Sequence, residues 1–460
     1  MADLTRRAAL ALGAAACVAG SAQAQTPPYL RTDIGALRRV LVHSIVETDE
    51  PVDRLGEALL PDAESDIPAA VRQQAGLMAL LRQSGVEVIE LTDALQTAID
   101  ATRASGVFEA WIEAAFPRLA GLDNITAATV LGRDPRTQYR LGEDGAYHHG
   151  ADDSTSTMWT RDSAFMTPQG LVICNSASFR RRRENMLLRF AYAHSPLLDA
   201  YPIAFDAVEE GLVIEGGDAT VVDERTLFLG AGNRTDPRIA PVLARRLNMD
   251  VLTVQTIKRD FLRTGPRFPP TPAINDLRLL FLHLDTFFTL VAPRHALTVP
   301  YVMEREHAED NPLSRYIRGA RVDTQMNEEA STAALEMLKE FGRVKLYRRG
   351  TGRELDLGEE TKLIDYLRRQ RYRFTYTGGP PPQDEADAFR HFMQVAYPEH
   401  RRQATNIVQV RPGRVIAYGG NPATKTALEA DGLAVDTFAG RELWAWHGGP
   451  HCLTQPLERD

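Results

Sequence analysis

The chain has 460 residues, of which 44% are apolar and 25% charged, and its formal net charge is −8. This length can bury a large hydrophobic core, and the composition is that of a globular protein, not of a disordered or collagen-like one. The negative net charge argues against a nucleic acid as the main partner, because contact with phosphates needs a basic face.

Residues 1–24 differ in composition from the rest of the chain. Twin arginines at 6 and 7 precede an Ala/Leu/Val run, and an AQA cleavage pattern follows at 22–24. The pattern predicts a signal peptide of the twin-arginine kind, and therefore an exported, periplasmic protein with no membrane span after cleavage. The apolar run is too short for a transmembrane anchor, whereas a lipoprotein anchor at Cys17 stays open as an alternative.

Three cysteines occur in the chain: Cys17 in the predicted leader, Cys174 in the apolar segment LVIC, and Cys452 near the C-terminus. Two cysteines in the mature chain do not make a disulfide scaffold. We therefore expect one buried inert thiol and one reactive thiol, although a disulfide between Cys174 and Cys452 stays open at this stage.

Beyond the leader, strand and helix patterns alternate. A strand at 40–42, a helix at 69–83 and a strand at 86–91 indicate an α/β unit, and a mainly helical insertion is expected at about 92–150. After Met158 strands are expected at 170–174, 212–214, 219–222, 226–229, 344–347, 407–410, 415–418 and 435–438, and helices at 237–247, 330–341, 386–395 and 424–431. No sequence repeat or linker divides the chain, so residues 25–460 are expected to form one domain.

The apolar stretch at 279–290, LLFLHLDTFFTL, is predicted to be a fully buried strand. His283 and Asp285 interrupt it two residues apart, so both side chains would project from one face of an extended strand. Burying an ionisable pair is costly unless the pair is hydrogen-bonded or takes part in chemistry. A core histidine satisfied by its neighbour is the plain structural alternative.

Three further stretches place polar residues at the ends of expected strands. Asp162 lies in MWTRDSAF, Glu215 and Asp218 flank a glycine pair in VIEGGDATVV, and Cys452 follows GGPH near the C-terminus. The glycine pair lets the backbone turn tightly or approach a ligand closely, although a hairpin with solvated acids is the plain alternative. A thiol, a histidine and several acids meet the requirements of nucleophilic catalysis with an acid–base partner.

The set contains two more acids than a catalytic triad needs. A cationic, planar, nitrogen-rich substrate explains the surplus, because paired carboxylates bind a guanidinium through two hydrogen bonds. A nearby cation, either a protonated histidine or the substrate, would also lower the pKa of the thiol and favour the reactive thiolate.

At these residues the sequence resembles a known family. TRD, EGGD, HLDTFFT and GGPHC, in that order, with GALRRVLVH at 35–43, closely resemble the arginine deiminases of the guanidino-group-modifying superfamily. The resemblance covers nearly the whole mature chain, including the helical insertion. It implies a pseudo-fivefold α/β propeller, the pentein fold, which composition and periodicity do not indicate.

The resemblance also implies roles for the motif residues. Cys452 would attack the guanidinium carbon, while His283 would protonate the departing ammonia and then activate water. Glu215 would orient His283, and Asp162 and Asp285 would clamp the guanidinium nitrogens. The implied reaction turns a guanidino group into a ureido group, as from arginine to citrulline, and requires neither a metal nor an organic cofactor.

Arg181 and Arg234 match family positions that face the amino-acid end of the substrate, with Asp218 near the same end. The resemblance therefore implies that the two arginines contact the substrate carboxylate. A small guanidino compound is the expected partner, and homo-oligomerisation stays open.

Four positions depart from the family pattern, one of them Ser156, which stands where an asparagine is usual. His447 stands where the family has an arginine five residues before the nucleophile, Trp446 replaces a glycine, and Trp159 replaces a phenylalanine. Histidine in place of arginine removes a permanently charged group that could hold a carboxylate through two hydrogen bonds. We therefore expect an altered grip on the α-carboxylate, and a substrate that is arginine or an arginine derivative.

Three other functions stay open. An amidinotransferase would use the same thiol, histidine and carboxylates but pass the amidino group to an amine. An exported binding protein would hold a guanidinium with the same acids, yet it has no need of the thiol and the histidine. A papain-type protease would use the thiol and the histidine but not the acidic clamp.

Overall fold

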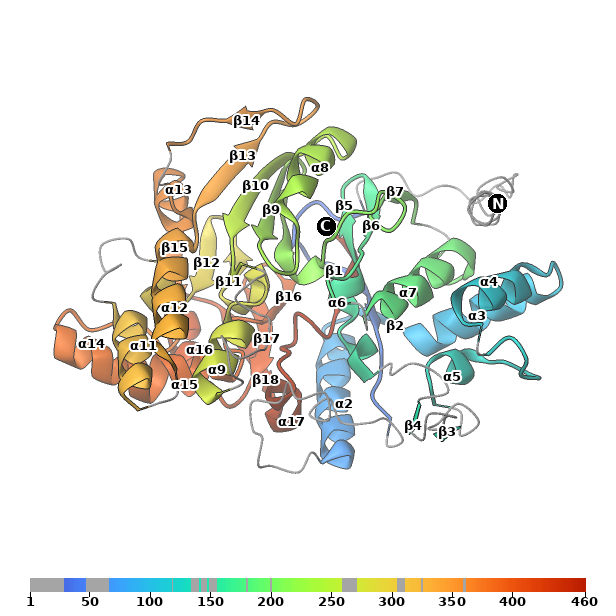
Figure 1. Ribbon diagram of the computed structural model, residues 1–460, viewed down its shortest axis with the longest axis horizontal. Coiled ribbons are helices and arrows are strands. Elements are labelled where there is room, and N and C mark those ends of the chain that lie inside the picture. Colours follow the sequence, from blue (N-terminus) through green and yellow to red (C-terminus); the bar gives the residue numbers. More distant parts are fainter. Residues whose placement is uncertain are drawn as a thin grey trace.

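Figure 1 shows the computed structural model of the chain. It describes residues 29–46, 66–117, 119–133, 140–141, 147–148, 155–178, 181–198, 201–258, 271–303, 311–323, 326–358 and 361–460. The predicted leader and Cys17 lie outside these residues. Within the described ranges, no helix has both the length and the apolar character that crossing a membrane requires.

Five three-stranded units with one topology account for most strands of the described residues. In each unit the first strand pairs antiparallel with the second, and the second pairs parallel with the third. The first strands are β19 (Gln455–Arg459), β5 (Ala164–Thr167), β8 (Ala219–Asp223), β11 (Phe288–Ala292) and β16 (Val408–Arg411). The second strands are β1 (Leu37–Val42), β6 (Gly170–Ile173), β9 (Thr226–Ala231), β12 (His295–Thr298) and β17 (Arg414–Tyr418). The third strands are β2 (Glu87–Glu90), β7 (Ile203–Asp206), β10 (Asp250–Gln255), β15 (Arg373–Tyr376) and β18 (Ala434–Phe438).

Helices make the crossover from the second to the third strand of each unit, as a parallel pair requires. They are α2 (Ile67–Gln83), α7 (Arg182–His194), η5 with α8 (Pro237–Ile239, Ala240–Arg246), α10 to α13 (Pro300–Met303, Pro312–Val322, Glu328–Glu340, Leu363–Arg369) and α16 (Pro422–Ala430). Two more strands, β13 (Val344–Tyr347) and β14 (Glu354–Leu355), extend the third unit to a five-stranded sheet. The architecture of the described residues is mixed α/β. None of its sheets closes on itself.

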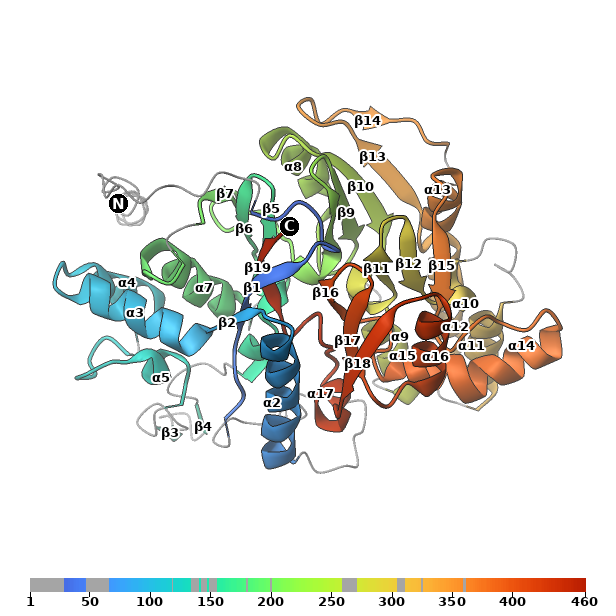
Figure 2. The same cartoon turned by 180° about the vertical axis from the view of Figure 1, so that it is seen from behind.

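Helices lie at both ends of the long axis of the molecule (Figure 1). One end carries α3 (Leu91–Arg103) and α4 (Val107–Ala115), followed in sequence by α5 (Ala127–Val130), within the segment expected as a helical insertion. The other end carries α11 and α14 (Glu385–His391), and α14 continues through a π-helical turn, η9 (Phe392–Ala396), into α15 (Tyr397–Arg401). Seen from behind, β1, β16, β17 and β18 lie between these helical ends (Figure 2).

Helix α2 illustrates how the local sequence determines an element. The Asp66 side chain accepts a hydrogen bond from the Ala69 backbone N–H and so caps the helix, and Pro68 follows within the first turn. Leu77 and Leu81 are completely buried at a four-residue spacing, which is the spacing of one helix face. The helix predicted at 69–83 therefore forms and begins two residues earlier.

Most predicted elements after Met158 are confirmed. The strands expected at 170–174, 219–222, 226–229, 344–347, 407–410, 415–418 and 435–438 correspond to β6, β8, β9, β13, β16, β17 and β18. The strand expected at 212–214 is wrong, because Ile214 forms only an isolated bridge with Asn175. A short ladder of β3 (Arg140–Leu141) and β4 (Tyr147–His148) also occurs late in the segment expected to be mainly helical. The rest of 134–150 lies outside the described residues.

The prediction of a single strand at 279–290 is also wrong. Helix α9 (Pro272–Leu280) ends inside the stretch, a 3₁₀ turn η7 (Leu284–Thr286) follows, and β11 starts only at Phe288. The Thr286 hydroxyl donates to the carbonyls of Leu280 and His283, so local side-chain hydrogen bonds hold a turn where the apolar pattern indicates a strand. His283 and Asp285 therefore sit before and within a turn, not along one strand face.

Candidate active site

The five predicted catalytic residues, and the predicted substrate contact Asp218, lie in the loops before the first strands of four units. With the strand that each precedes, they are Asp162 (β5), Glu215 and Asp218 (β8), His283 and Asp285 (β11), and Cys452 (β19). Short helical turns shape three of these loops: α6 (Thr160–Ser163), η4 (Gly216–Asp218) and η7. The shared topology thus brings residues that are far apart in the sequence to one buried site.

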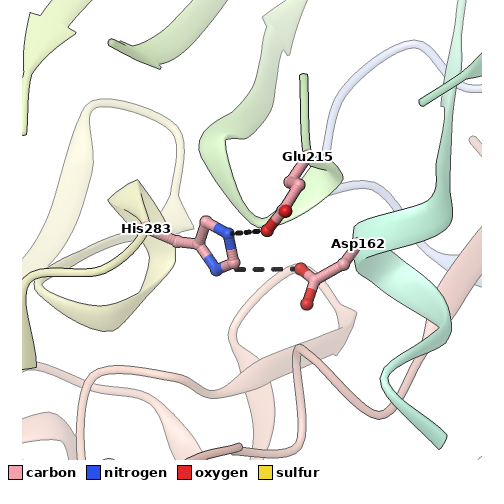
Figure 3. A group of neighbouring side chains, drawn as sticks. All are labelled: Asp162, Glu215 and His283. Carbon is pink, nitrogen blue, oxygen red and sulfur yellow. Dashed lines mark hydrogen bonds and ion pairs between the residues drawn. The ribbon is translucent and has the colours of Figure 1, made fainter. Parts of the chain in front are cut away.

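His283 lies between two carboxylates that come from different units (Figure 3). Its Nε2 atom is 2.8 Å from Oε2 of Glu215, and its Nδ1 atom is 3.7 Å from Oδ1 of Asp162. Burial alone would lower the pKa of His283, but the charge of Asp162 and the hydrogen bond to Glu215 raise it to about 9. The imidazole is therefore a cation at neutral pH.

Gly217 allows this approach. A Cβ atom at this position would lie 2.8 Å from Nδ1 of His283 and 2.9 Å from Oδ1 of Asp162, which is closer than real Cβ contacts allow. The EGGD motif therefore needs its second glycine for the close passage of the backbone past the histidine.

Arg181 and Arg234, the two predicted carboxylate contacts, pair with acids of the site. Nη1 of Arg181 lies 2.7 Å from Oδ2 of Asp162, and Nη2 lies 2.8 Å from Glu184. Nη1 of Arg234 lies 3.4 Å from Oε1 of Glu215. Burial would raise the pKa of Glu215, yet the charge of Arg234 and the contact with His283 hold it well below its ordinary value.

Cys452 is buried and lies beside a carboxylate. Its Sγ atom is 3.5 Å from Oδ2 of Asp285. Burial, followed by the charges of Asp285 and Asp162, raises the pKa of the Cys452 thiol well above its ordinary value. Cys174 is likewise a buried thiol, and both cysteines are free, so the disulfide that the sequence left open is not present. Burial also raises the pKa of Cys174 well above its ordinary value.

The sequence did not indicate a buried hydrogen-bonded chain behind Asp285. Nδ1 of His451 lies 2.8 Å from Oδ2 of Asp285, and Nη2 of Arg161 donates to Nε2 of His451 at 2.8 Å. Arg161 also lies 3.2 Å from Oδ1 of Asp33. Because Arg161 is only a donor, His451 must be neutral and donate its Nδ1–H to Asp285. Burial and then Arg161 lower the pKa of His451 accordingly.

Asp218 supports the loop that carries His283. Its Oδ1 accepts from the Leu284 backbone N–H at 3.0 Å, and its Oδ2 accepts from the Thr235 hydroxyl at 2.7 Å. Burial raises the pKa of Asp218 to about 6 although His283 and both hydrogen bonds oppose the rise. The observed hydrogen bonds of the Asp218 carboxylate are thus made with other residues of the protein.

Three of the positions that depart from the family pattern lie around the nucleophile loop. Gly448 packs on Trp159, since a Cβ atom there would lie 1.9 Å from the indole ring, and Trp446 is buried. His447 has the backbone φ of 70° typical of the left-handed region, and its two ring nitrogens are buried without hydrogen-bond partners among the described residues. Burial, and then Arg401, lower the pKa of His447 to about 3, so its side chain is neutral.

A metal site is an alternative interpretation of the carboxylate–histidine group. Asp162, Glu215 and His283 offer ligand atoms within 4.8 Å of one another. Arg181 and Arg234 already pair with the two carboxylates, however, and His283 is protonated at neutral pH. The group suits a proton-transferring histidine better than a set of free metal ligands.

Asn406 is a further site residue that the sequence did not indicate. It lies directly before β16, the first strand of the fifth unit, and its Nδ2 atom is 3.1 Å from Sγ of Cys452. All five units therefore contribute a polar residue from the loop before their first strand. This shared position is the signal that would have found Asn406.

The sequence of the chain is similar to those of known proteins. The family model "Arginine deiminase" matches residues 125–459. The arginine deiminase of Rhodococcus erythropolis is 26% identical over 472 residues, covering 96% of this chain and 99% of the relative. That of Metamycoplasma hominis is 25% identical over 451 residues, covering 94% and 96%.

Solved structures with similar folds include unliganded AgrE, with a TM-score of 0.48 and 14% identity, covering 92% of this chain. This chain spans about 40% of the AgrE chain. SxtG, an amidinotransferase from Microseira wollei, has a TM-score of 0.46 and 14% identity, covering 94% of this chain and 97% of SxtG. By the match of its sequence over residues 125–459, the chain belongs to the arginine deiminase family.

Proposed function

We propose that the protein hydrolyses the guanidino group of arginine, or of an arginine derivative, to a ureido group and ammonia. One observation carries this proposal. Asp162 and Asp285 lie beside His283 and Cys452, and each has a buried Oδ1 atom without a hydrogen-bond partner among the described residues. A buried unpaired carboxylate oxygen is costly, and the N–H groups of a guanidinium would satisfy both.

Substrate binding activates the nucleophile in this mechanism. In the free site, burial and two carboxylates keep the Cys452 thiol protonated. A guanidinium held by Asp162 and Asp285 adds a positive charge next to the sulfur, so the thiol releases its proton to solvent. The thiolate then attacks the guanidinium carbon, and a carbon–sulfur bond forms.

His283 transfers the protons of both half-reactions. Its Nε2–H is donated to Glu215, so the proton on Nδ1 is the one available for transfer to the leaving amino group. The carbon–nitrogen bond breaks and ammonia leaves. Neutral His283 then takes a proton from water, and the hydroxide adds to the carbon. The carbon–sulfur bond breaks to release the thiolate, and the added hydroxyl group loses its proton to solvent as it becomes the carbonyl of the ureido product.

Arg181 and Arg234 are proposed to contact the carboxylate at the other end of the substrate. In the structure both guanidinium groups pair with acids of the site, so each must exchange at least one partner when such a substrate binds. Neutral His447 adds no charge to this end. We therefore include arginine derivatives with a modified or missing carboxylate among the candidate substrates.

The five units are proposed to be arranged as the blades of a pseudo-fivefold α/β propeller, with residues 92–150 inserted between the first and second blades. The repeated topology and the repeated position of polar residues before each first strand support this arrangement. The exported, periplasmic location predicted from residues 1–24 also stays a proposal. Cell fractionation with and without residues 1–24 tests it, and equal retention of both forms in the cytosol would contradict it.

The experiment that tests the function measures ammonia release from a panel of guanidino compounds without an added amine. The panel contains arginine, arginine amide, a peptidyl arginine and agmatine. Cys452→Ala should abolish release, whereas Cys174→Ala, which removes the other buried thiol, should retain it. Product formation only after an amine is added would indicate amidino transfer, and no turnover of any compound would contradict hydrolysis.

A further inference from the structure

Asn406 holds the nucleophilic cysteine through both atoms of its side-chain amide. The Cys452 backbone N–H donates to Oδ1 at 3.1 Å, and Nδ2 lies 3.1 Å from Sγ. Since a backbone N–H is only a donor, the amide atom facing it must be the oxygen. The orientation of the amide is therefore determined, and Nδ2–H points at the sulfur.

The surroundings of Asn406 keep this amide in place. Its side chain is completely buried, and Nδ2 also donates to the carbonyl of Asp285 at 3.3 Å. A Cβ atom on Gly449 would lie 2.4 Å from Oδ1 of Asn406, so only glycine lets the nucleophile loop pack against it. Thr405 further joins this segment to the loop of Asp285, because its hydroxyl donates to the carbonyl of Thr286. Asn406 thus links the nucleophile loop to one arm of the predicted guanidinium clamp.

Two carboxylates act against a negative charge on the Cys452 sulfur. Asp285 lies 3.5 Å from the sulfur, and Asp162 also opposes a negative charge there. The Gly449 backbone and the Asn406 amide act in the other direction, and both lower the pKa of the thiol. A neutral hydrogen-bond donor can stabilise a thiolate without repelling a cationic substrate. An arginine or a lysine at this position would repel such a substrate.

We propose that Asn406 is a catalytic residue of this enzyme, whose Nδ2–H stabilises the Cys452 thiolate and aims the sulfur at the guanidinium carbon. The proposal rests on the proposed function, because it takes Cys452 as the nucleophile. It assigns the fifth unit a part in the chemistry beside the four units whose motifs were apparent from the sequence.

The test measures how fast iodoacetamide alkylates Cys452 between pH 6 and 11, without substrate, in the full mature chain. Mass spectrometry of the peptides separates Cys452 from Cys174. Asn406→Ala removes the donor, and Asn406→Asp keeps the shape and the acceptor but puts a carboxylate oxygen towards the sulfur. Asn421→Asp is the matched control, since Asn421 is a buried asparagine bonded to Arg402 outside the site.

We expect the alkylation profile of Asn406→Ala to move to higher pH and that of Asn406→Asp to move further. Below the thiol pKa the rate should fall roughly 10- to 100-fold, the range for a hydrogen bond to a charged group. In the ammonia-release assay, both Asn406 variants should lower kcat by a larger factor than they raise KM. Asn421→Asp should match the wild type. An unchanged profile in a folded Asn406→Ala protein, shown by its melting temperature, would overturn the proposal even if turnover falls.

A measurement on the wild type keeps the proposal testable if both variants unfold. With ¹⁵N-labelled asparagine, the side-chain amide resonances of Asn406 should shift with the ionisation of Cys452, and the shift should be absent in Cys452→Ala. Asn406 amide resonances that do not change as Cys452 ionises would overturn the proposal. Both measurements are made without substrate, so a failure of the proposed hydrolysis would show separately as an absence of ammonia.

Discussion

His283 donates Nε2–H to Glu215 across 2.8 Å, within a pair that is almost completely shielded from solvent. The partner carboxylate keeps the imidazole charged despite its burial, and it leaves Nδ1 as the atom that faces Asp162 and the rest of the site. Proton transfer in the proposed reaction therefore depends on a histidine whose ordinary pKa has been raised by its neighbours.

A pH profile tests this dependence. Because the pKa of His283 is raised to about 9, kcat for ammonia release should fall as the pH rises through about 9. Glu215→Gln removes a charge and a hydrogen bond that favour the imidazolium, so this limb should move down by roughly one pH unit or more. Glu458→Gln, which changes an acid bonded to Tyr201 away from the site, should leave the limb in place. If the alkaline limb of the Glu215→Gln profile falls at the same pH as that of the wild type, this account of His283 is contradicted.

Much of the fold was apparent from local sequence patterns, but the relation between the parts was not. Strands such as β6 and β17 carry apolar, buried runs, whereas β7 and β15 each contain a single buried residue and were not predicted. The five units share no sequence repeat, because the strands of each unit are stabilised by a different set of packing contacts. Only long-range pairing, such as that of β19 with β1, shows that the ends of the chain form a single unit.

For the site, motifs located the residues that lie in distinctive local sequences. Asp162, Glu215, His283 and Cys452 stand next to glycines, aromatics or other polar residues, and the structure places them together. Asn406 lies in an ordinary segment, QATNIV, where nothing local marks it. Its place before β16 stands out only beside the corresponding positions of the other four units, and its contact with a sulfur atom 46 positions away is shown by the tertiary structure.

Gly217→Ala tests the close passage of the backbone past the histidine. The added methyl group would overlap Nδ1 of His283 and Oδ1 of Asp162, and one of the two must move. Displacing a catalytic group by about 1 Å can cost on the order of 100-fold in rate, so we expect at least that loss in kcat. Gly121→Ala is the control, because a Cβ atom there has open space around it. Normal activity of Gly217→Ala would show that the backbone relaxes and that the glycine is not required.

His451→Ala tests the hydrogen-bonded chain behind Asp285. The variant leaves a buried carboxylate without this neutral donor, and losing a hydrogen bond to a charged group costs roughly 1.5–3 kcal/mol of unfolding free energy at pH 7. Burial would raise the pKa of Asp285, but His451 holds it below the ordinary value, so this stabilisation is present above about pH 4 and is lost as the pH falls through the lowered pKa. Urea unfolding at pH 7 and at acidic pH measures the effect. A loss of stability in His451→Ala that is equal at both pH values would argue that His451 acts by packing alone.

His447→Arg tests whether the departures from the family pattern determine the substrate. The ring nitrogens of His447 are buried without hydrogen-bond partners among the described residues. Because Trp446 replaces a glycine of the family pattern, Trp446→Gly is combined with the arginine. A new charged contact to a carboxylate is worth roughly 1.5–3 kcal/mol, which corresponds to about 10- to 100-fold in kcat/KM. We expect the double variant to gain on free arginine relative to arginine amide, while Trp446→Gly alone gains little. Steady-state assays with both compounds measure this ratio. If the wild type already turns over free arginine better than every analogue, and the double variant leaves the ratio unchanged, these positions do not set the specificity.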